Sequence, residues 1–550
     1  MATGADAIVK SLEAEGCDRI FLVPGESYLA TLNALAGQNT IQLVTCRHEG
    51  GAGFMAIADA KLTGKPGVAF VSRGPGATNA SIAVHTAEQD AVPFILFIGQ
   101  VSRDELGRKA FQEVDYAKTF ADMAKGVWTI MDADQAPEVI ARAWQVARSG
   151  TPGPVVVVLP EDMQFDETDA QPAGPLPVPA SPAAASVVAD AAQLLAGSNR
   201  PLMIVGGGVD SEDGRTALIR AAEHWQIPII TSFKRQDLFP NDNRLYAGNL
   251  GFNIPQPHVD LLSDADLILA VGTRLGDTTT QGYKFPSMPP KQTLVHVYAN
   301  ADEIGRNFRT DLGVAADPIS FLDGLMTENP VIVDQTARDQ WVERLKAYID
   351  NLMDADPAPA DDGVNFGLVI TELKSYLTDN TIFVTDAGNF SSWLHRHIRF
   401  NGRQRLLGAV SGAMGIGLPA AAAAALREPE TQVLCFLGDG GAMMTGNELA
   451  TALQYGANIK VFVSNNGSYG TIRLHQEKYF PGRKSGTDLI NPDFAKWAEA
   501  FGATGLKIST DADIAPVMKQ VFDTNGPVVV ETLTSLERIS AYVSISDLGK

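Results

Sequence analysis

The chain has 550 residues, enough for two to four domains that each have a core of their own. Its apolar content of 45% and its net charge of −21 indicate a soluble globular protein whose surface repels nucleic-acid phosphates and anionic lipid, so neither is an expected partner. Cys17, Cys46 and Cys435 form no CxxC pair, and residues 1–16 lack the apolar stretch of a signal peptide. These features predict a cytoplasmic protein.

The first part of the chain alternates between predicted strands and helices. Apolar runs at 19–23, 41–44, 68–71, 94–98 and 155–159 are predicted strands. Helices are expected at 5–15 and 28–35 and from about residue 49, and the glycine-rich residues 72–79 are expected to form a loop. This alternation predicts a parallel α/β sheet within residues 1–165. Residues 166–184, dense in proline, alanine and acid, are a predicted linker.

A second α/β unit is predicted over residues 185–345. Its strand at 201–205 runs into the glycines 206–208, which resemble a dinucleotide-binding loop, although a lone glycine cluster is more often a tight turn. The later strand at 294–297 ends in Tyr298, Ala299 and Asn300, where a dinucleotide site would favour an acid. A bound FAD is therefore judged unlikely.

A third α/β unit is predicted over residues 363–550, after a proline-containing linker at 354–363. It contains a strand at 382–384, a turn at 386–389, a loop at 411–419 and a late strand at 526–531. Residues 409–426 are uncharged, but their glycines, proline and alanine run predict a buried loop and helix rather than a membrane span. The fold class is thus α/β, with three doubly wound parallel-sheet domains.

Two strands of the third unit end in side chains that carry oxygen ligands. The apolar run 433–437 stops at Gly438-Asp439-Gly440, and, after a predicted helix at 445–453, the run 459–463 leads into Asn465 and Asn466. Open α/β sheets bind ligands at such carboxyl ends. A carboxylate, an amide oxygen and a loop carbonyl suit Mg²⁺ and leave coordination positions for diphosphate, which the glycines would let approach the backbone.

The Gly-Asp-Gly sequence, followed after 24 residues by Asn-Asn, resembles the motif of thiamine diphosphate (ThDP)-dependent enzymes. A bare Gly-Asp-Gly would indicate only a turn, whereas the spacing and both strands favour the motif. The resemblance implies that Asp439, the Asn466 side chain and the Ser468 carbonyl hold Mg²⁺. It implies further ThDP contacts from Thr78, Gly388, Asn389, Gly412, Met414, Gly438, Gly440, Gly441, Ala442, Tyr469, Gly470, Thr471 and Ile472. Met414 would bend the cofactor, although methionine is more often core filler.

Glu49 lies between a predicted strand end and a helix start, where the helix dipole alone would favour an acid. Its Arg-His-Glu context, 390 residues before Asp439, resembles the ThDP-family segment whose glutamate hydrogen-bonds the pyrimidine ring and promotes its imino tautomer. Glu49 and Asp439 belong to different units. The resemblance therefore implies a homodimer or homotetramer whose sites are shared between chains.

Other segments, including 74–79, 110–113, 152–155 and 412–415, resemble the acetolactate synthase branch. There Phe111 and Gln112 would face the substrate. The chain departs from the biosynthetic enzymes of that branch at Gly25-Glu26, which places a carboxylate where they have glycine, at Arg73 and at His475, which replaces a tryptophan. Near the reacting carbon, these polar groups would favour a hydroxylated or charged substrate; the alternative for each of them is a position facing solvent. His395 and His397 are expected at a surface or interface rather than on a metal.

The resemblance implies a ThDP- and Mg²⁺-dependent enzyme that decarboxylates a 2-oxo acid and joins the product to a second carbonyl, as acetolactate synthase does. The alternatives are a simple 2-oxo acid decarboxylase and an acyl-CoA lyase, for which no obvious basic cluster would bind the CoA phosphate. A non-catalytic paralogue that binds ThDP and regulates a partner would have no need of Glu49.

Overall fold

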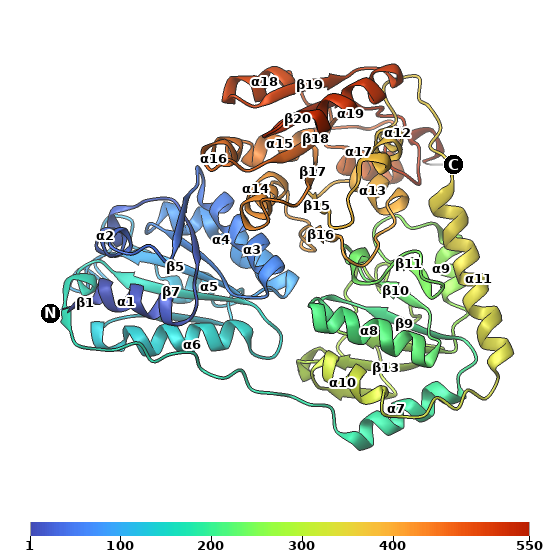
Figure 1. Cartoon of the computed structure of the whole chain (residues 1–550), viewed down its shortest axis with the longest axis horizontal. Coiled ribbons are helices and arrows are strands. Elements are labelled where there is room, and N and C mark those ends of the chain that lie inside the picture. The colour runs from blue at the N-terminus through green and yellow to red at the C-terminus, as the bar shows by residue number, and fades with distance from the viewer. Residues whose placement is uncertain (1, 549–550) are drawn as a thin grey trace.

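The computed structural model describes residues 2–548, which form three α/β lobes (Figure 1). We call residues 2–168 the first lobe, 185–354 the middle lobe and 366–547 the third lobe. Each lobe contains a six-stranded sheet in which all neighbouring strands are parallel, as the sequence predicted. The central strands are buried along nearly their whole length because helices cover both faces of each sheet.

The first lobe has the strand order β3-β2-β4-β5-β7-β6. These strands are β3 (Gln42–Thr45), β2 (Arg19–Leu22), β4 (Gly67–Val71), β5 (Phe94–Gln100), β7 (Pro154–Pro160) and β6 (Gly126–Thr129). Its main helices are α1 (Gly4–Ala14), α2 (Leu29–Ala36), α3 (Glu49–Thr63), α4 (Pro75–Asp90) and α6 (Ala136–Arg148). The expectation of a loop through residue 79 is wrong, because α4 begins at Pro75, whose fixed φ suits a first helical turn.

The third lobe has the order β16-β15-β17-β18-β20-β19, which repeats the topology of the first lobe. Its strands are β15 (Ile382–Thr385), β16 (Arg405–Leu407), β17 (Val433–Gly438), β18 (Ile459–Asn465), β19 (Thr504–Ile508) and β20 (Val528–Leu533). Its helices are α12 (Phe366–Leu373), α13 (Ser391–His397), α14 (Gly417–Arg427), α15 (Asp439–Thr445), α16 (Glu448–Gln454), α17 (Gly470–Tyr479), α18 (Phe494–Phe501) and α19 (Ile514–Asp523).

Two local expectations for the third lobe are wrong. Leu418 and Pro419 lie in the first turn of α14 rather than in a loop. The single helix expected at 445–453 is divided between α15 and α16, with the break at Gly446 and Asn447. A Cβ on Gly446 would lie 2.4 Å from the Ala442 carbonyl oxygen and 2.7 Å from the Trp497 ring, so close packing requires glycine at this break.

The middle lobe has the order β11-β10-β9-β12-β13-β14, which is the strand order of dinucleotide-binding folds. The strands are β9 (Pro201–Val205), β10 (Ile229–Thr231), β11 (Tyr246–Asn249), β12 (Leu267–Val271), β13 (Thr293–Tyr298) and β14 (Leu312–Ala315). The helices are α7 (Ala185–Gly197), α8 (Glu212–Trp225), α9 (Gln256–Leu262), α10 (Pro318–Leu325) and α11 (Gln335–Asp354). A Cβ on Gly208 would lie 2.7 Å from the Gly272 Cα, so close packing between two turns already explains this glycine. That FAD is not bound here stays a prediction.

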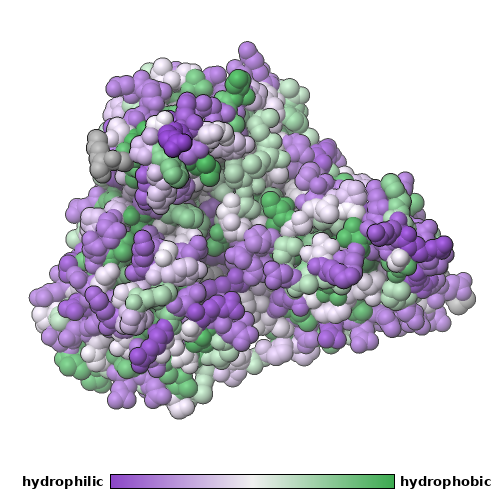
Figure 2. Space-filling model, turned by 180° about the vertical axis from the view of Figure 1, so that it is seen from behind, coloured by the Kyte–Doolittle hydropathy of each residue, from purple (hydrophilic) through white to green (hydrophobic). Residues whose placement is uncertain are grey.

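Two connections join the lobes. Residues 169–184 run without helix or strand along the base of the molecule to α7, and the long helix α11 leads back toward the third lobe (Figure 1). The face seen in Figure 2 is largely hydrophilic, with hydrophobic residues in small groups. Within residues 2–548, no helix is both long and apolar enough to cross a membrane.

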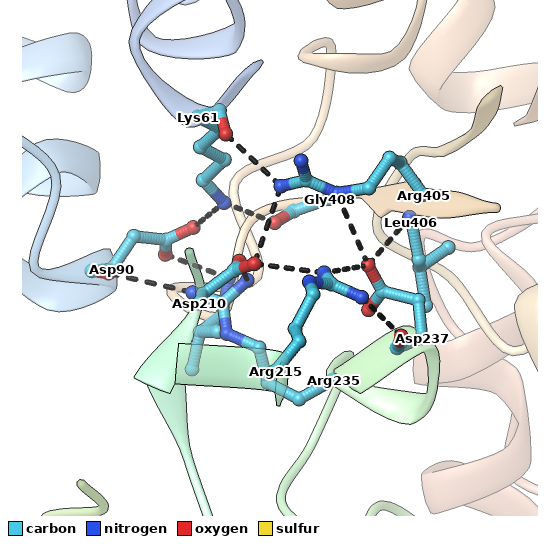
Figure 3. Close-up of polar contacts among 10 residues, drawn as sticks. Lys61, Asp90, Asp210, Arg215, Arg235, Asp237, Arg405, Leu406 and Gly408 are labelled. Atoms are coloured by element: carbon cyan, nitrogen blue, oxygen red, sulfur yellow. Dashed lines mark hydrogen bonds and ion pairs between the residues drawn. The ribbon is translucent and has the colours of Figure 1, made fainter. Parts of the chain in front are cut away.

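Buried charges join all three lobes at one point (Figure 3). In the first lobe, Lys61 forms an ion pair with Asp90 and donates a hydrogen bond to the Gly408 carbonyl of the third lobe at 2.7 Å. In return, Asp90 accepts the backbone N–H of Val410 at 2.7 Å. The Lys61 and Asp90 side chains are only 5% and 0% exposed. The loop that follows β16 is therefore fixed to the first lobe.

The middle lobe supplies the other half of this cluster (Figure 3). Arg215 contacts Asp210 at 2.8 Å and Asp237 at 2.6 Å, and Arg405 of the third lobe reaches Asp210 at 3.2 Å. Each buried charge thus has a partner, and several partners belong to another lobe. Removing one member would leave an uncompensated buried charge, which is strongly destabilising.

Candidate functional site

A cavity of about 330 Å³ lies between the middle and third lobes, at the carboxyl ends of β15, β17 and β18. This is the sheet edge at which the sequence predicted a ligand site. The predicted site residues that line the cavity are Gly388, Asn389, Gly412, Met414, Gly438, Asp439, Gly440, Gly441, Asn466, Ser468, Tyr469, Gly470, Thr471, Ile472 and His475.

Asp439 is the first residue of α15 and is held by three N–H donors. Its Oδ1 accepts the Gly440 backbone N–H at 2.9 Å, and its Oδ2 accepts the Ser468 N–H at 3.2 Å and the Asn491 Nδ2 at 2.8 Å. The side chain is buried, and burial raises the pKa of Asp439 against the effect of these donors. Asn491, 52 residues further along the chain, has no signal in the sequence motif.

Asn466 and Ser468 follow β18 in a tight turn. The Asn466 Oδ1 accepts the Ser468 N–H at 3.1 Å, and Gly467 between them has a φ of +65°, which favours glycine. Among residues 2–548, no three His, Cys, Asp or Glu side chains form a metal-binding group. The Asp439 Oδ2 and the Asn466 Oδ1 both accept the Ser468 N–H, so the predicted ligands lie together at this turn. One carboxylate, one amide and one carbonyl are a set that suits Mg²⁺ when its other ligands come from a diphosphate.

The turn that carries Met414 is fixed from both sides. The Gly415 N–H lies 2.9 Å from both carboxylate oxygens of Asp386, and the Thr445 hydroxyl donates to the Gly415 carbonyl. Asp386 is fully buried, which raises its pKa to about 6. Since Asp90 holds Val410 and Asp386 holds Gly415, the residues between them, including Gly412 and Met414, have little freedom to move.

Gly388 and Asn389 also line the cavity, in the turn that follows β15. A Cβ on Gly388, whose φ is +155°, would lie 2.5 Å from the Phe390 ring. The Asn389 backbone N–H donates to Thr471 Oγ1 at 3.0 Å, and its side-chain amide donates to the Ile539 carbonyl. Asn389 therefore connects this turn to the start of α17.

The structure places Glu49 elsewhere, at the first position of α3 in the first lobe. The Asn79 Nδ2 donates to its Oε2 at 2.9 Å, and His48 caps the helix by accepting the Gly50 N–H at 3.0 Å. The helix start is as predicted. Glu49 does not line the cavity of its own chain.

The other predicted first-lobe residues gather near Glu49 rather than at the cavity. A Cβ on Gly76 would lie 3.3 Å from Glu49 Oε1, and Gln112, with a φ of +63°, packs against Gly74. Gly25 packs on Ser72, Glu26 and Thr78 are exposed, and Phe111 is 76% exposed. Ala442 belongs neither to the cavity lining nor to the group near Glu49, and lies in the hydrophobic core. The single chain therefore presents two separate groups of site residues.

The sequence predicts His395 and His397 at a surface or interface, but the structure buries both side chains. His395 is 7% exposed and His397 2% exposed, because α13 packs into the third lobe. His395 also lines the cavity, with Phe233, Lys234 and Phe252 of the middle lobe and Tyr542 near the end of the described chain. The sequence motifs missed these residues because lobe packing, not spacing along the chain, brings them together.

Comparison with known proteins agrees with this geometry. The N-terminal TPP-binding domain of thiamine pyrophosphate enzymes matches residues 2–119, the central domain matches 188–325 and the C-terminal TPP-binding domain matches 386–532. A relative named acetolactate synthase large subunit, from Parasynechococcus marenigrum, is 33% identical over 93% of this chain and 84% of its own length. The chain belongs to the thiamine pyrophosphate enzyme family.

Other relatives in this family have similar names. Acetolactate synthase of Mycobacterium bovis is 32% identical over 97% of this chain and 88% of its own. Acetolactate synthase isozyme 1 large subunit of Escherichia coli is 30% identical over 97% of this chain and 94% of its own. The family resemblance inferred from the Asp439 and Glu49 motifs is confirmed, and the matched C-terminal TPP-binding domain contains most of the cavity residues.

Proposed function

We propose that this protein decarboxylates a 2-oxo acid and joins the remaining fragment to a second carbonyl compound, as an acetolactate synthase-like carboligase. The observation that carries the proposal is one cavity lined by Asp439, Asn466, Ser468 and Met414. Relatives of nearly full length are named acetolactate synthases, which supports the same activity.

The residues of the cavity have separate roles in this proposal. Asp439, the Asn466 side chain and the Ser468 carbonyl would hold Mg²⁺ beside the diphosphate of ThDP. Met414, on its fixed turn, would pack against the cofactor. When bound, ThDP supplies the carbon nucleophile and the electron sink for loss of CO₂.

Glu49 acts in this proposal as the carboxyl group that holds a proton on the cofactor's pyrimidine ring. Because Glu49 lies outside its own chain's cavity, it serves the cavity of a second copy in a homodimer. Large apolar side chains are exposed at both groups of site residues, with Phe111 76%, Ile472 54% and Met443 51% exposed. A dimer interface would cover them. The three cysteines are unpaired, which suits a cytoplasmic enzyme.

A simple 2-oxo acid decarboxylase is the second candidate, favoured by His475. Its imidazole lines the cavity beside Ile472, where a ring nitrogen could deliver the proton that a decarboxylase adds to the fragment left after CO₂ loss. The test is product analysis after incubation with pyruvate, ThDP and Mg²⁺. Acetolactate supports the carboligase, acetaldehyde alone supports the decarboxylase, and the absence of CO₂ release from a panel of 2-oxo acids rejects both.

A further inference from the structure

Lys234 is an unusual residue in the cavity wall. It follows β10 in the middle lobe, is 1% exposed and has a φ of +56°, in the left-handed region that a lysine rarely adopts. Within residues 2–548, its ammonium makes one hydrogen bond, to the Asp386 carbonyl at 3.2 Å. An ammonium has three N–H donors, so two stay available. A buried cation on strained backbone indicates a function rather than a contribution to stability.

His395 lines the same cavity from α13 of the third lobe, and its ring lies 6.4 Å from the ring of Phe233, the residue before Lys234. It is 7% exposed, and neither of its ring nitrogens has a hydrogen-bond partner in the described part of the chain. Burial and the nearby Lys234 charge lower the pKa of His395 to about 3, so the ring is neutral and offers one donor and one acceptor. Buried polar groups are normally paired, so two unpaired nitrogens beside a cavity point to a ligand.

We propose that Lys234 and His395 form a subsite for a substrate carboxylate, at the end of the cavity lined by Phe233 and Phe252. The Lys234 ammonium supplies the charge and the His395 imidazole supplies a further N–H donor. The Asp386 and Asp90 carboxylates already act on the Lys234 charge, so a singly charged carboxylate suits this end of the cavity better than a phosphate, which would bring more negative charge. The subsite deepens the proposed function and rests on it in assuming that the substrate is a 2-oxo acid.

The carboxylate bound here is one that survives the reaction. A cation beside the carboxylate that departs as CO₂ would stabilise the ground state more than the transition state, and so would slow its loss. The ammonium therefore suits either the distal carboxylate of a dicarboxylic 2-oxo acid donor or the carboxylate of the second, acceptor molecule. Both sources present the same chemistry to Lys234 and His395.

The experiment measures binding of two unreactive probes to the ThDP–Mg²⁺ holoenzyme by calorimetry. Succinate represents the distal carboxylate of a donor, and oxamate represents a monocarboxylic acceptor. Lys234→Met keeps the length of the side chain and removes its charge, and it should weaken at least one probe tenfold or more. His395→Phe should weaken the same probe by a smaller factor, and it tests the subsite independently if Lys234→Met does not fold.

Lys460→Met is the matched control. Lys460 is also a buried lysine, but its ammonium is bound by the Thr524 and Gly526 carbonyls at 2.6 and 2.8 Å, outside the cavity. This variant should bind both probes as the wild type does. Weaker succinate binding in Lys234→Met assigns the donor carboxylate, and weaker oxamate binding assigns the acceptor.

The proposed subsite is overturned if the wild-type holoenzyme binds neither probe. It is also overturned if the Lys234→Met and His395→Phe variants each bind the two probes as tightly as wild type does. Probe binding requires no turnover. A subsite that passes this test in a protein releasing no CO₂ would mean that the proposed function alone has failed. Normal carboligation with unchanged probe binding would mean that the subsite alone has failed.

Discussion

The carboxylate of Glu448, on α16 of the third lobe, accepts the backbone N–H of His48 at 2.9 Å, one residue before Glu49 in the first lobe. It also accepts the Arg47 N–H at 3.0 Å. A Cβ on Gly51 would lie 2.5 Å from the Glu448 Oε1, so the helix start that carries Glu49 fits closely around this carboxylate. The lobe that supplies Asp439 therefore also sets the position of Glu49.

Glu448→Gln should slow hydrogen–deuterium exchange at the ThDP C2 position roughly tenfold to a hundredfold, since hydrogen bonds to a charged group are worth about 1.5–3 kcal/mol. The amide would turn an N–H group toward backbone donors and displace Glu49. Affinity for ThDP and Mg²⁺ should stay close to that of wild type. Glu428→Gln is the control, because Glu428 is exposed. Exchange at the wild-type rate in Glu448→Gln would contradict the role of Glu448 in positioning Glu49.

Glu49→Gln should reduce the same exchange rate further, by roughly 10²–10⁴, because it removes the acid itself and keeps its shape. Exchange is measured by quenching the holoenzyme in deuterated buffer at short times. Glu138→Gln serves as the comparison, because Glu138 is an exposed carboxylate in the first turn of another helix of the same lobe, α6. A wild-type exchange rate in the Glu49 variant would remove Glu49 from the site.

Asp439→Ala should abolish most Mg²⁺-dependent ThDP binding, because it removes the only carboxylate among the proposed metal ligands. Asn491→Ala should cause a smaller loss, since Asn491 only holds the Asp439 Oδ2 in place. Calorimetry with ThDP, with and without Mg²⁺, measures both. Equal affinity in a folded Asp439→Ala protein would disprove the metal assignment.

Sharing of sites between chains can be tested with two inactive variants. Glu49→Gln and Asp439→Ala are unfolded together and refolded as a mixture. In a mixed dimer with shared sites, one site receives both substitutions and the other receives neither. When half of the dimers are mixed, about a quarter of all sites should therefore be intact and active. Mass spectrometry confirms the mixed dimers. If activity does not return in them, each site is built within one chain.

Acid should destabilise the protein through buried histidines such as His258. Its Nε2 lies 3.0 Å from the Ala247 carbonyl, and burial lowers the pKa of His258 from its ordinary value of 6.5 to about 4. Below pH 6.5 the unfolded chain binds a proton that the folded chain does not. As the pH is lowered from 6.5 to 4, His258 therefore reduces the free energy of unfolding by up to about 1.4 kcal/mol per pH unit.

Calorimetric melting temperatures between pH 7.5 and 5 measure this effect. His258→Gln should lose less stability on acidification than wild type, and the exposed His85→Gln should behave as wild type does. Parallel curves for wild type and His258→Gln would show that His258 does not contribute in this pH range.

The three parallel sheets were predictable because buried strands are continuous apolar runs and the turns after them contain glycine. Edge strands carry weaker signals. β6 (Gly126–Thr129) is only partly buried and was not predicted, and α4 and α14 begin earlier than their glycine-rich sequences indicate. The common topology of the first and third lobes is a property of strand order, which local patterns do not encode.

The Asp439–Ser468 part of the cavity was predictable because two neighbouring strands place its donors within one short segment of chain. Lys234, His395, Asn491 and Glu448 were not assigned roles, because each acquires its partners through contacts between distant segments. The ring of His395 also lies 6.4 Å from that of Phe233, which belongs to another lobe. Motif spacing contains no information about such contacts.

The buried charge cluster at the junction of the lobes limits how this protein can exchange parts with its relatives. Asp210 and Asp237 of the middle lobe are neutralised partly by Arg405 of the third lobe, and Asp90 binds the loop that leads to Met414. A middle lobe transplanted from a homologue with other residues at these positions would leave charges buried without partners. Recombination between family members should therefore succeed only when the three lobes, or the matching charges, are inherited together.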